Sequence, residues 1–332
     1  MIFGLRYVIL TPLKGEAMKR LLRVIGKAGI VVAVTAILLP VLIIGGLNAA
    51  KFVIYKDYYS LKTNICKNPG LSDGFVCQGL AADEENGIFL ISGYMDNSEA
   101  SRIYVTNEEN ESHYVSLYKG GEAFTGHAGG VAVTRGIVYL ASESRIYRIP
   151  LSSILLSENG QRVEIGEGVR VNNHASFVFT NEEYLYVGEF NNGDKYVTDH
   201  PYDTPEGKHY AIISRYPIDD LTSPDKIYSI RDKVQGACFT PDGKVVLSTS
   251  YGITDSVYYV YNEADAPDSG MTLDGAPVYL LYDAVKEIKG PAMSEDMDYY
   301  RGMAISLSES ASDKYRFGKL FFANKIYGLD VD

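Results

Sequence analysis

The chain contains no tryptophan, only three cysteines and only five histidines among its 332 residues. It also holds no GxxxxGK(S/T), HExxH, CxxC, GxSxG or GxGxxG sequence. The sequence therefore gives no sign of a phosphate-binding loop, a zincin helix, a thiol redox pair, a nucleophile elbow or a dinucleotide-binding turn.

Outside the N-terminal segment, acidic residues outnumber basic residues. The chain has 31 Lys and Arg against 42 Asp and Glu, a net charge of −11. Residues 1–50 hold six of the basic residues and one acidic residue, so residues 51–332 carry −16. A domain this acidic repels phosphate backbones, which argues against nucleic-acid binding.

One long uncharged stretch lies near the N-terminus, at residues 28–50. A helix of this length, at about 1.5 Å per residue, covers the roughly 30 Å hydrocarbon core of a bilayer. Four basic residues precede it: Lys19, Arg20, Arg23 and Lys27. The positive-inside rule then predicts a cytoplasmic basic leader at 1–27, a transmembrane anchor at 28–50 and an extracytoplasmic domain at 51–332 in the cell membrane.

Two alternatives remain open for this segment. A cleaved signal peptide is the competing interpretation, although the apolar run exceeds the usual 7–15 residues. Met18 begins a more typical leader, so residues 1–17 are a candidate start-site artefact.

The three cysteines are compatible with an oxidising compartment in which the chain forms few disulfides. Cys66 and Cys77 are close enough in sequence for a predicted disulfide, which would contribute about 2–3 kcal/mol in the chain-entropy model. Cys238 lies in the apolar sequence GACFT, which predicts a buried thiol.

An internal repeat predicts the fold. A polar residue, a small-apolar strand, a tight turn and a second apolar strand recur five times, and the copies start at Gln78, His127, His174, Gln235 and Glu295. The starts are 49, 47, 61 and 60 residues apart, the length of a four-stranded propeller blade. Further Tyr-, Val- and Ile-rich runs follow the first four hairpins, among them PVYLLYD at 277–283 after the fourth. The pattern indicates an all-β, five-bladed β-propeller.

The fifth copy has room for only three strands before the C-terminus. KFVIYKD at 51–57 is similar to KIYSIRD at 226–232. We therefore predict that 51–57 supplies the missing strand and closes the ring, which would leave no exposed sheet edge at the joint.

The repeat also predicts a polar site at one end of the ring. The inner strands start there with Gln78, His127, His174, Gln235 and Glu295, and the returning strands end there with Tyr94, Glu143, Glu189, Tyr251 and Glu309. Such convergence is typical of a ligand site. It also fits a structural network that closes the channel mouth by hydrogen bonding.

Chemistry at this opening is a further hypothesis. His127, His174 and Glu295 are the candidate ligands of a divalent cation, with Glu143, Glu189 and Glu309 as other carboxylate donors. Glu295, Glu189, His127 and His174 are the candidate acid–base residues.

The third copy carries the longest loop at this end, residues 191–210. A loop of this length on a rigid scaffold is typical of a lid or binding loop, and a solvated insertion is the alternative.

These features predict an extracytoplasmic propeller that binds a small polar ligand, a glycan or a protein segment at the opening, with or without a cation. The alternatives are a propeller enzyme that uses channel Glu and His residues, and an interaction domain whose 191–210 loop docks a partner.

The five copies resemble a group of bacterial secreted or membrane-anchored five-bladed propeller proteins of unassigned function. The resemblance covers nearly all of 73–332 and rests on the HAGG and QG starts, the STSYG ending and the PAMSEDM and SESASDKYR sequences. It implies a fold and a location. The first blade, GFVCQGLAADEENGIFLISGY, is also similar to the opening motif of plant-type glutaminyl cyclotransferases, which implies acid–base carboxylates in the channel and cyclotransferase activity. Hydrolase or lyase chemistry is the other form of the enzyme alternative.

Overall fold

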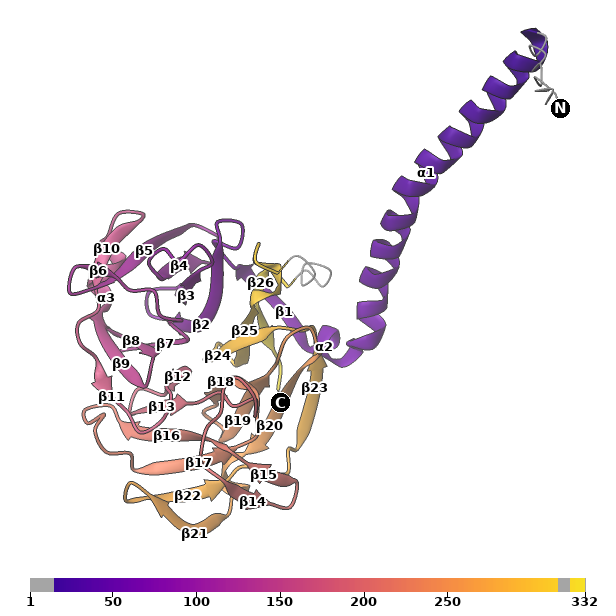
Figure 1. Cartoon of the computed structure of the whole chain (residues 1–332). Coiled ribbons are helices and arrows are strands. Elements are labelled where there is room, and N and C mark those ends of the chain that lie inside the picture. The colour runs from indigo at the N-terminus through magenta and orange to yellow at the C-terminus, as the bar shows by residue number, and fades with distance from the viewer. Residues whose placement is uncertain (1–14, 316–322, 332) are drawn as a thin grey trace, which may run out of the picture. The chain divides into compact units, whose positions relative to one another are not determined.

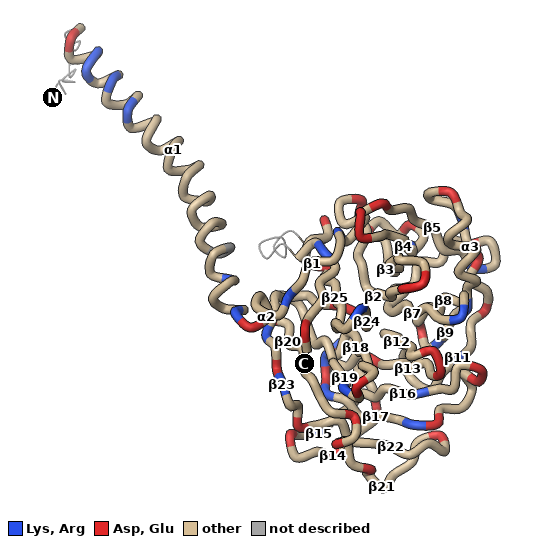
Figure 2. Tube along the Cα trace, turned by 180° about the vertical axis from the view of Figure 1, so that it is seen from behind, with Lys and Arg blue, Asp and Glu red and all other residues tan. Residues whose placement is uncertain are grey.

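A computed structural model describes residues 15–315 and 323–331 of the chain. The chain divides into two compact units, Met1–Ala50 and Lys51–Asp332. Helix α1 (Gly15–Ile54) contains Pro40 and is long and apolar enough, by length and composition, to cross a membrane. Four of its basic residues lie toward its N-terminal end, and Lys51 lies in its last turn (Figure 2).

Residues 51–315 and 323–331 form a five-bladed β-propeller, as the repeat predicts (Figure 1). Each blade is an antiparallel sheet of four strands that follow one another from the centre of the ring outward. Blade 1 holds β2 (Phe75–Asp83), β3 (Ile88–Met95), β4 (Arg102–Asn107) and β5 (Ser112–Lys119). Blade 2 holds β7 (Gly130–Thr134), β8 (Ile137–Ser142), β9 (Arg145–Pro150) and β11 (Val169–Arg170). Blade 3 holds β12 (Phe177–Thr180), β13 (Tyr184–Gly188), β16 (Ala211–Pro217) and β17 (Lys226–Ile230).

Blade 4 holds β18 (Val234–Phe239), β19 (Lys244–Thr249), β20 (Ser256–Asn262) and β23 (Lys286–Gly290). Blade 5 holds β24 (Ser294–Tyr300), β25 (Met303–Ser308), β26 (Lys325–Leu329) and β1 (Lys62–Lys67). Strand β1 pairs antiparallel with β26, so an N-terminal strand closes the ring. That part of the prediction is confirmed.

The prediction that 51–57 is the closing strand is wrong. Residues 51–57 belong to α1 and to α2 (Lys56–Leu61), and the strand lies at 62–67 instead. Tyr55 and Tyr58 are each 3% exposed. The Tyr58 ring stacks on Tyr258, with centroids 6.0 Å apart. A spacing of three puts both rings on one side of a helix, whereas a strand would turn them to opposite faces.

The predicted fourth strand of blade 4 is also placed elsewhere. Strand β22 (Ala276–Leu280) pairs in parallel with β17 of blade 3, and β23 completes blade 4. In the same way β10 (Gln161–Glu164) pairs in parallel with β5 of blade 1. Each of these strands covers the outer edge of the preceding blade, which satisfies hydrogen-bonding groups that an edge would leave open.

Shorter elements complete the chain between these strands. They are β6 (Glu122–Ala123), α3 (Leu151–Leu155), β14 (Tyr202–Thr204), β15 (Gly207–His209), β21 (Asp268–Leu273) and the 3₁₀ turns η1 (Glu263–Asp265) and η2 (Glu309–Ala311).

The inner strands approach one another backbone to backbone. A Cβ atom on Gly130 would lie 2.5 Å from the Val178 nitrogen, and one on Gly236 would lie 2.5 Å from the Asp296 Cα. Asp296 and Asp298 on β24 accept hydrogen bonds from the Leu80 and Ala82 backbone N–H groups of β2 at 3.2 and 2.7 Å. These carboxylates therefore join blade 5 to the free inner edge of blade 1.

The disulfide predicted between Cys66 and Cys77 is not formed. Both are free, buried thiols in the structure, as is Cys238. The Cys77 sulfur accepts a hydrogen bond from Asn68 Nδ2 at 3.0 Å and donates one to the Ser308 carbonyl at 3.4 Å. Cys77 therefore serves as a packed, hydrogen-bonded side chain of the core.

Candidate functional site

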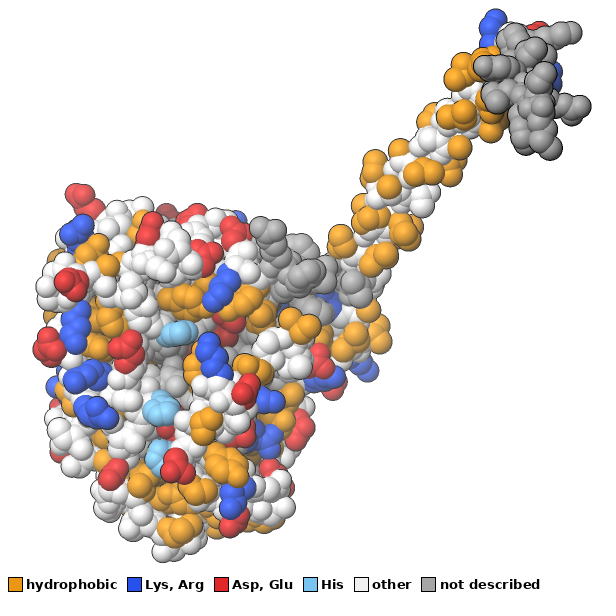
Figure 3. Space-filling model, viewed as in Figure 1, with side chains coloured by type: hydrophobic (Ala, Val, Ile, Leu, Met, Phe, Trp, Pro, Cys, Tyr) orange, Lys and Arg blue, Asp and Glu red, His pale blue; other side chains and the backbone are white. Residues whose placement is uncertain are grey.

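A cavity of about 700 Å³ opens at the end of the ring where the inner strands start. Nine of the ten belt residues predicted from the repeat line it: Gln78, Tyr94, His127, Glu143, His174, Gln235, Tyr251, Glu295 and Glu309. The space-filling view shows a hollow on this face, with histidine side chains around it (Figure 3). All five blades contribute to the lining.

Local backbone geometry aims these side chains at the cavity in two ways. In blades 2 and 3 a residue in the left-handed region follows the histidine, Ala128 after His127 and Ala175 after His174, each at φ 49°. In blades 1, 4 and 5 the β2, β18 and β24 ladders shift register at Gln78, at Gln235 and between Ser294 and Met297. Such β-bulges re-aim a side chain out of the ladder.

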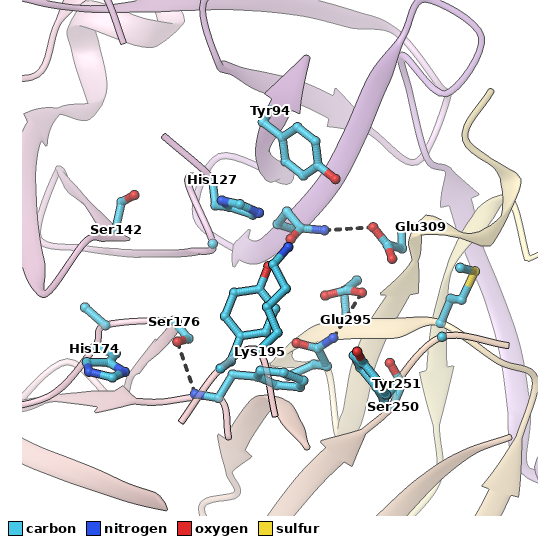
Figure 4. A pocket seen from close by; sticks show the side chains of 18 of the residues that line it. Tyr94, His127, Ser142, His174, Ser176, Lys195, Ser250, Tyr251, Glu295 and Glu309 are labelled. Atoms are coloured by element: carbon cyan, nitrogen blue, oxygen red, sulfur yellow. Dashed lines mark hydrogen bonds between the residues drawn. The ribbon is translucent and has the colours of Figure 1, made fainter. Parts of the chain in front are cut away.

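The carboxyl groups of Glu295 and Glu309 both line the cavity, and each is hydrogen-bonded to a glutamine amide (Figure 4). Gln78 Nε2 donates to Glu309 Oε2 at 3.0 Å, and Gln235 Nε2 donates to Glu295 Oε1 at 3.4 Å. Hydrogen bonding to Glu309 contributes to the raised pKa of Glu295, and hydrogen bonding to Tyr315 opposes the rise in the pKa of Glu309.

Two carboxyl groups can share a hydrogen bond only if one of them holds a proton. Burial and the charge of Glu309 raise the pKa of Glu295 well above its ordinary value, and burial also raises that of Glu309. Glu295 is 4% exposed. Near neutral pH the pair therefore retains a proton that the two carboxyl groups share.

His127 and His174 also line the cavity. The His127 ring centroid is 4.9 Å from that of Tyr94. Desolvation lowers the pKa of His127, and the charges of Lys314 and Lys195 lower it further, against an opposing effect of Glu143. Near neutral pH the imidazole is therefore uncharged and can accept a hydrogen bond.

The candidate cation ligands are not gathered into a metal site. Within residues 15–315 and 323–331, no three His, Cys, Asp or Glu side chains are grouped so that they could hold a metal ion. His127, His174 and Glu295 share the cavity without forming a coordination cluster, because each projects from a different blade.

Glu189, the tenth belt residue, does not line the cavity. It is fully buried, and its carboxylate contacts His200 Nδ1 at 2.6 Å and accepts from the Ile212 N–H at 3.2 Å. The pair connects His200, in the middle of the 191–210 segment, to the residue that follows β13 of blade 3 by one position. Glu189 therefore lies outside the cavity lining in a buried contact with His200, and its acid–base or ligand role stays a prediction.

The 191–210 loop supplies part of the cavity wall, as a binding loop would. Phe190 and two loop residues, Lys195 and Tyr196, line the cavity, and β14 and β15 pair to form a small hairpin in the rest of the segment. The Phe190 ring packs against Tyr196 and Tyr251, with centroid distances of 5.7 and 6.2 Å.

Several lining residues were not predicted from the sequence. They are Ser142, Ser176, Phe190, Lys195, Tyr196, Ser250, Met293, Lys314 and Tyr315. The Ser142 hydroxyl is buried and has no hydrogen-bond partner among the described residues. The sequence does hold a signal for four of them, Lys195, Tyr196, Lys314 and Tyr315. They belong to two copies of the tripeptide Asp-Lys-Tyr, at 194–196 and at 313–315.

Comparisons with known proteins concern the fold. No protein-family model matches the chain, and no curated protein matches it. Among solved structures it is similar to β-propeller proteins. One is the PQQ-bound aldose sugar dehydrogenase of Streptomyces coelicolor, with 16% identity over 74% of this chain and 76% of that one and a TM-score of 0.43.

Two further similarities are weaker. A gluconolactonase from Xanthomonas campestris is 16% identical over 74% of this chain and 73% of that one, with a TM-score of 0.38. BamB from Moraxella catarrhalis is 6% identical over 76% and 82% of the two chains, with a TM-score of 0.32. Similarity at this level extends to the propeller architecture alone.

Proposed function

We propose that the propeller binds a small polar ligand, a glycan or a protein segment in the cavity at the ring opening. One observation carries this proposal: nine polar or aromatic belt residues, from all five blades, line a single cavity of about 700 Å³. This volume is within the range of about 300–1,000 Å³ typical of small-molecule sites. The partnerless Ser142 hydroxyl in its wall adds support, because buried polar groups are normally hydrogen-bonded.

The test uses two tyrosines of matched exposure. Tyr251 is 42% exposed and lines the cavity, whereas Tyr210 is 40% exposed and does not. Thermal shift of the detergent-solubilised chain against a panel of sugars, amino acids and short peptides should find a stabilising compound. Tyr251→Ala should abolish that shift and Tyr210→Ala should retain it. Equal shifts in both variants would place binding outside the cavity.

The location proposed for this site is extracytoplasmic. Helix α1, of 40 residues, and the basic residues before its apolar part support a retained anchor with residues 1–27 in the cytoplasm. Protease added to intact spheroplasts should then degrade the propeller, while an N-terminal tag stays protected. A soluble propeller that lacks residues 1–50 would instead indicate a cleaved signal peptide.

The carboxyl pair favours a second candidate function, acid–base catalysis. Burial raises the pKa of both Glu295 and Glu309, so the pair retains a proton that it can give to a bound group and take back. His127 and His174 line the same cavity as further proton acceptors. The activity would be glutaminyl cyclotransferase-like, or that of a hydrolase or lyase.

Ammonia release from N-terminal glutaminyl peptides, and hydrolysis of lactones, would test the catalytic candidate directly. Glu295→Gln keeps the shape and hydrogen-bonding capacity of the side chain but carries no ionisable proton. Turnover that falls by about 10²-fold or more, with binding retained, would support catalysis. Unchanged turnover in the variant would exclude Glu295 as the acid.

A further inference from the structure

Two loops at the cavity mouth carry the same tripeptide. Asp194-Lys195-Tyr196 lies between β13 and β14, and Asp313-Lys314-Tyr315 follows η2. In both loops the Lys ammonium lies over the ring of the following Tyr, at 5.0 Å and 5.4 Å from the centroid. Both Lys-Tyr pairs line the cavity, so blades 3 and 5 present the same two side chains to one opening.

The two ammonium groups act on the same place. Both Lys314 and Lys195 lower the pKa of His127, after the larger effect of desolvation. Lys314 also hydrogen-bonds the Tyr94 hydroxyl and lies 4.6 Å from that ring centroid. Positive charge therefore converges on the wall formed by His127 and Tyr94.

Neither lysine is neutralised by an ion pair with a carboxylate in the part of the chain that the structure describes. Lys314 does interact electrostatically with Glu309: burial raises the pKa of the Glu309 carboxyl, and the charge of Lys314 opposes that rise. Residues 51–332 carry a net charge of −16. Two ammonium groups free of ion pairs at the mouth of a cavity in so acidic a domain favour an anionic group on the ligand.

The rest of the cavity is suited to hydroxyl groups. Both donors and acceptors are offered by the Gln78 and Gln235 amides, the Glu295 and Glu309 carboxyl pair and the partnerless Ser142 hydroxyl. The same cavity is also lined by four tyrosine side chains, those of Tyr94, Tyr196, Tyr251 and Tyr315. Aromatic faces pack against the apolar face of a sugar ring, while its hydroxyls need the mixed polar groups.

We propose, building on the ligand-binding function above, that the cavity binds an acidic sugar whose carboxylate lies between Lys195 and Lys314. Its hydroxyls are directed at the Gln78, Gln235 and Glu295 floor. A carboxylate carries one negative charge, and Glu143 and Glu309 in the same lining disfavour a doubly charged phosphate.

Isothermal titration of the full chain in detergent, with glucuronate, glucose and glucose 6-phosphate as probes, tests this proposal. Glucuronate should bind at least about tenfold more tightly than glucose. Lys195→Met and Lys314→Met should each remove most of that preference, because glucuronate loses an ionic partner that glucose does not use. Added salt should weaken glucuronate binding alone.

Lys208→Met is the matched control, because Lys208 is exposed on β15 of the same loop segment and does not line the cavity. It should bind glucuronate as the wild type does.

The outcomes separate this proposal from the ligand-binding function. Equal affinity for glucose and glucuronate, abolished by Tyr251→Ala, would overturn the acidic-sugar proposal and keep the ligand site. A preference for glucose 6-phosphate that both lysine variants lose would show that Lys195 and Lys314 bind a phosphate. It would overturn the proposal that they bind a carboxylate. Binding of none of the probes would overturn the acidic-sugar proposal, and the ligand-binding function would then rest on the wider compound panel.

Discussion

Asp298 offers the sharpest test of the electrostatics of the ring. Its Oδ2 accepts from the Ala82 N–H at 2.7 Å and its Oδ1 accepts from the Tyr299 N–H at 2.8 Å. The pKa of this carboxyl is raised from 3.8 to about 7. Burial is the largest cause, the two backbone hydrogen bonds oppose it, and the charge of Glu84 adds a smaller increase. The folded state therefore binds the Asp298 proton more tightly than the unfolded chain does.

The sign of the pH dependence follows. The contribution of Asp298 to the unfolding free energy is complete below pH 3.8 and is lost as the pH rises to about 7. Each pH unit in that window changes the free energy by about 1.4 kcal/mol. Between pH 5 and pH 8 the loss is about 3 kcal/mol in full, and about 1.5 kcal/mol if solvent at this partly exposed side chain halves the effect.

Asp298→Asn removes this titration. The amide nitrogen must face one of the two backbone N–H groups, which costs about 1–3 kcal/mol at every pH. At pH 5 the variant should therefore be less stable than the wild type, and at pH 8 the deficit should shrink by about 1.5–3 kcal/mol. Urea unfolding of the full chain in detergent, followed by tyrosine near-UV circular dichroism, measures both values.

Asp220→Asn is the control. Hydrogen bonds from Thr222 lower the pKa of the exposed Asp220, so its titration lies below pH 4 and its effect should be constant from pH 5 to pH 8. A deficit of Asp298→Asn that is also constant, within about 0.5 kcal/mol, would refute the inference that burial controls this carboxyl.

Three further predictions concern stability. A Cβ on Gly188 would lie 1.9 Å from the Phe177 ring, so Gly188→Ala should destabilise by about 1–3 kcal/mol, measured by urea unfolding; an unchanged midpoint would contradict the packing. Burial lowers and the Glu189 carboxylate raises the pKa of His200, with a net increase, so His200→Ala should cost more at pH 6 than at pH 8 in thermal melts; the reverse order would exclude the ion pair. All three thiols should resist alkylation in the native chain and react after non-reducing unfolding, as mass spectrometry would show; fewer than three adducts would indicate a disulfide.

The repeat made the fold and most of the site predictable. The inner hairpins recur with Gly at φ > 0 in four of their five turns, and Arg135-Gly136 and Arg301-Gly302 place both central residues there, as a type I′ hairpin requires. Because equivalent strand positions meet at one end of a ring, the polar residues at the copy starts could be placed at a common opening. That reasoning needs only local pattern and topology.

The sequence could not place residues whose position depends on partners far along the chain. Tyr55 lies in the segment 51–57, predicted as a strand, and the packing of the neighbouring Tyr58 against Tyr258 of blade 4 exists only in the folded chain. Glu189 occupies a belt position, but His200 draws its carboxylate away from the cavity. An isolated carboxylate looks the same in sequence whichever partner it finds.

The sequence by itself determined five blades, their hairpin turns, the apolar N-terminal segment and the polar belt, because each follows from local spacing and composition. Tertiary structure alone decided which strand closes the ring, which blade β10 and β22 join, and that Lys195 and Lys314 line one cavity. These depend on contacts between segments separated by many tens of residues, and the free energy of such contacts exists only once the ring has closed.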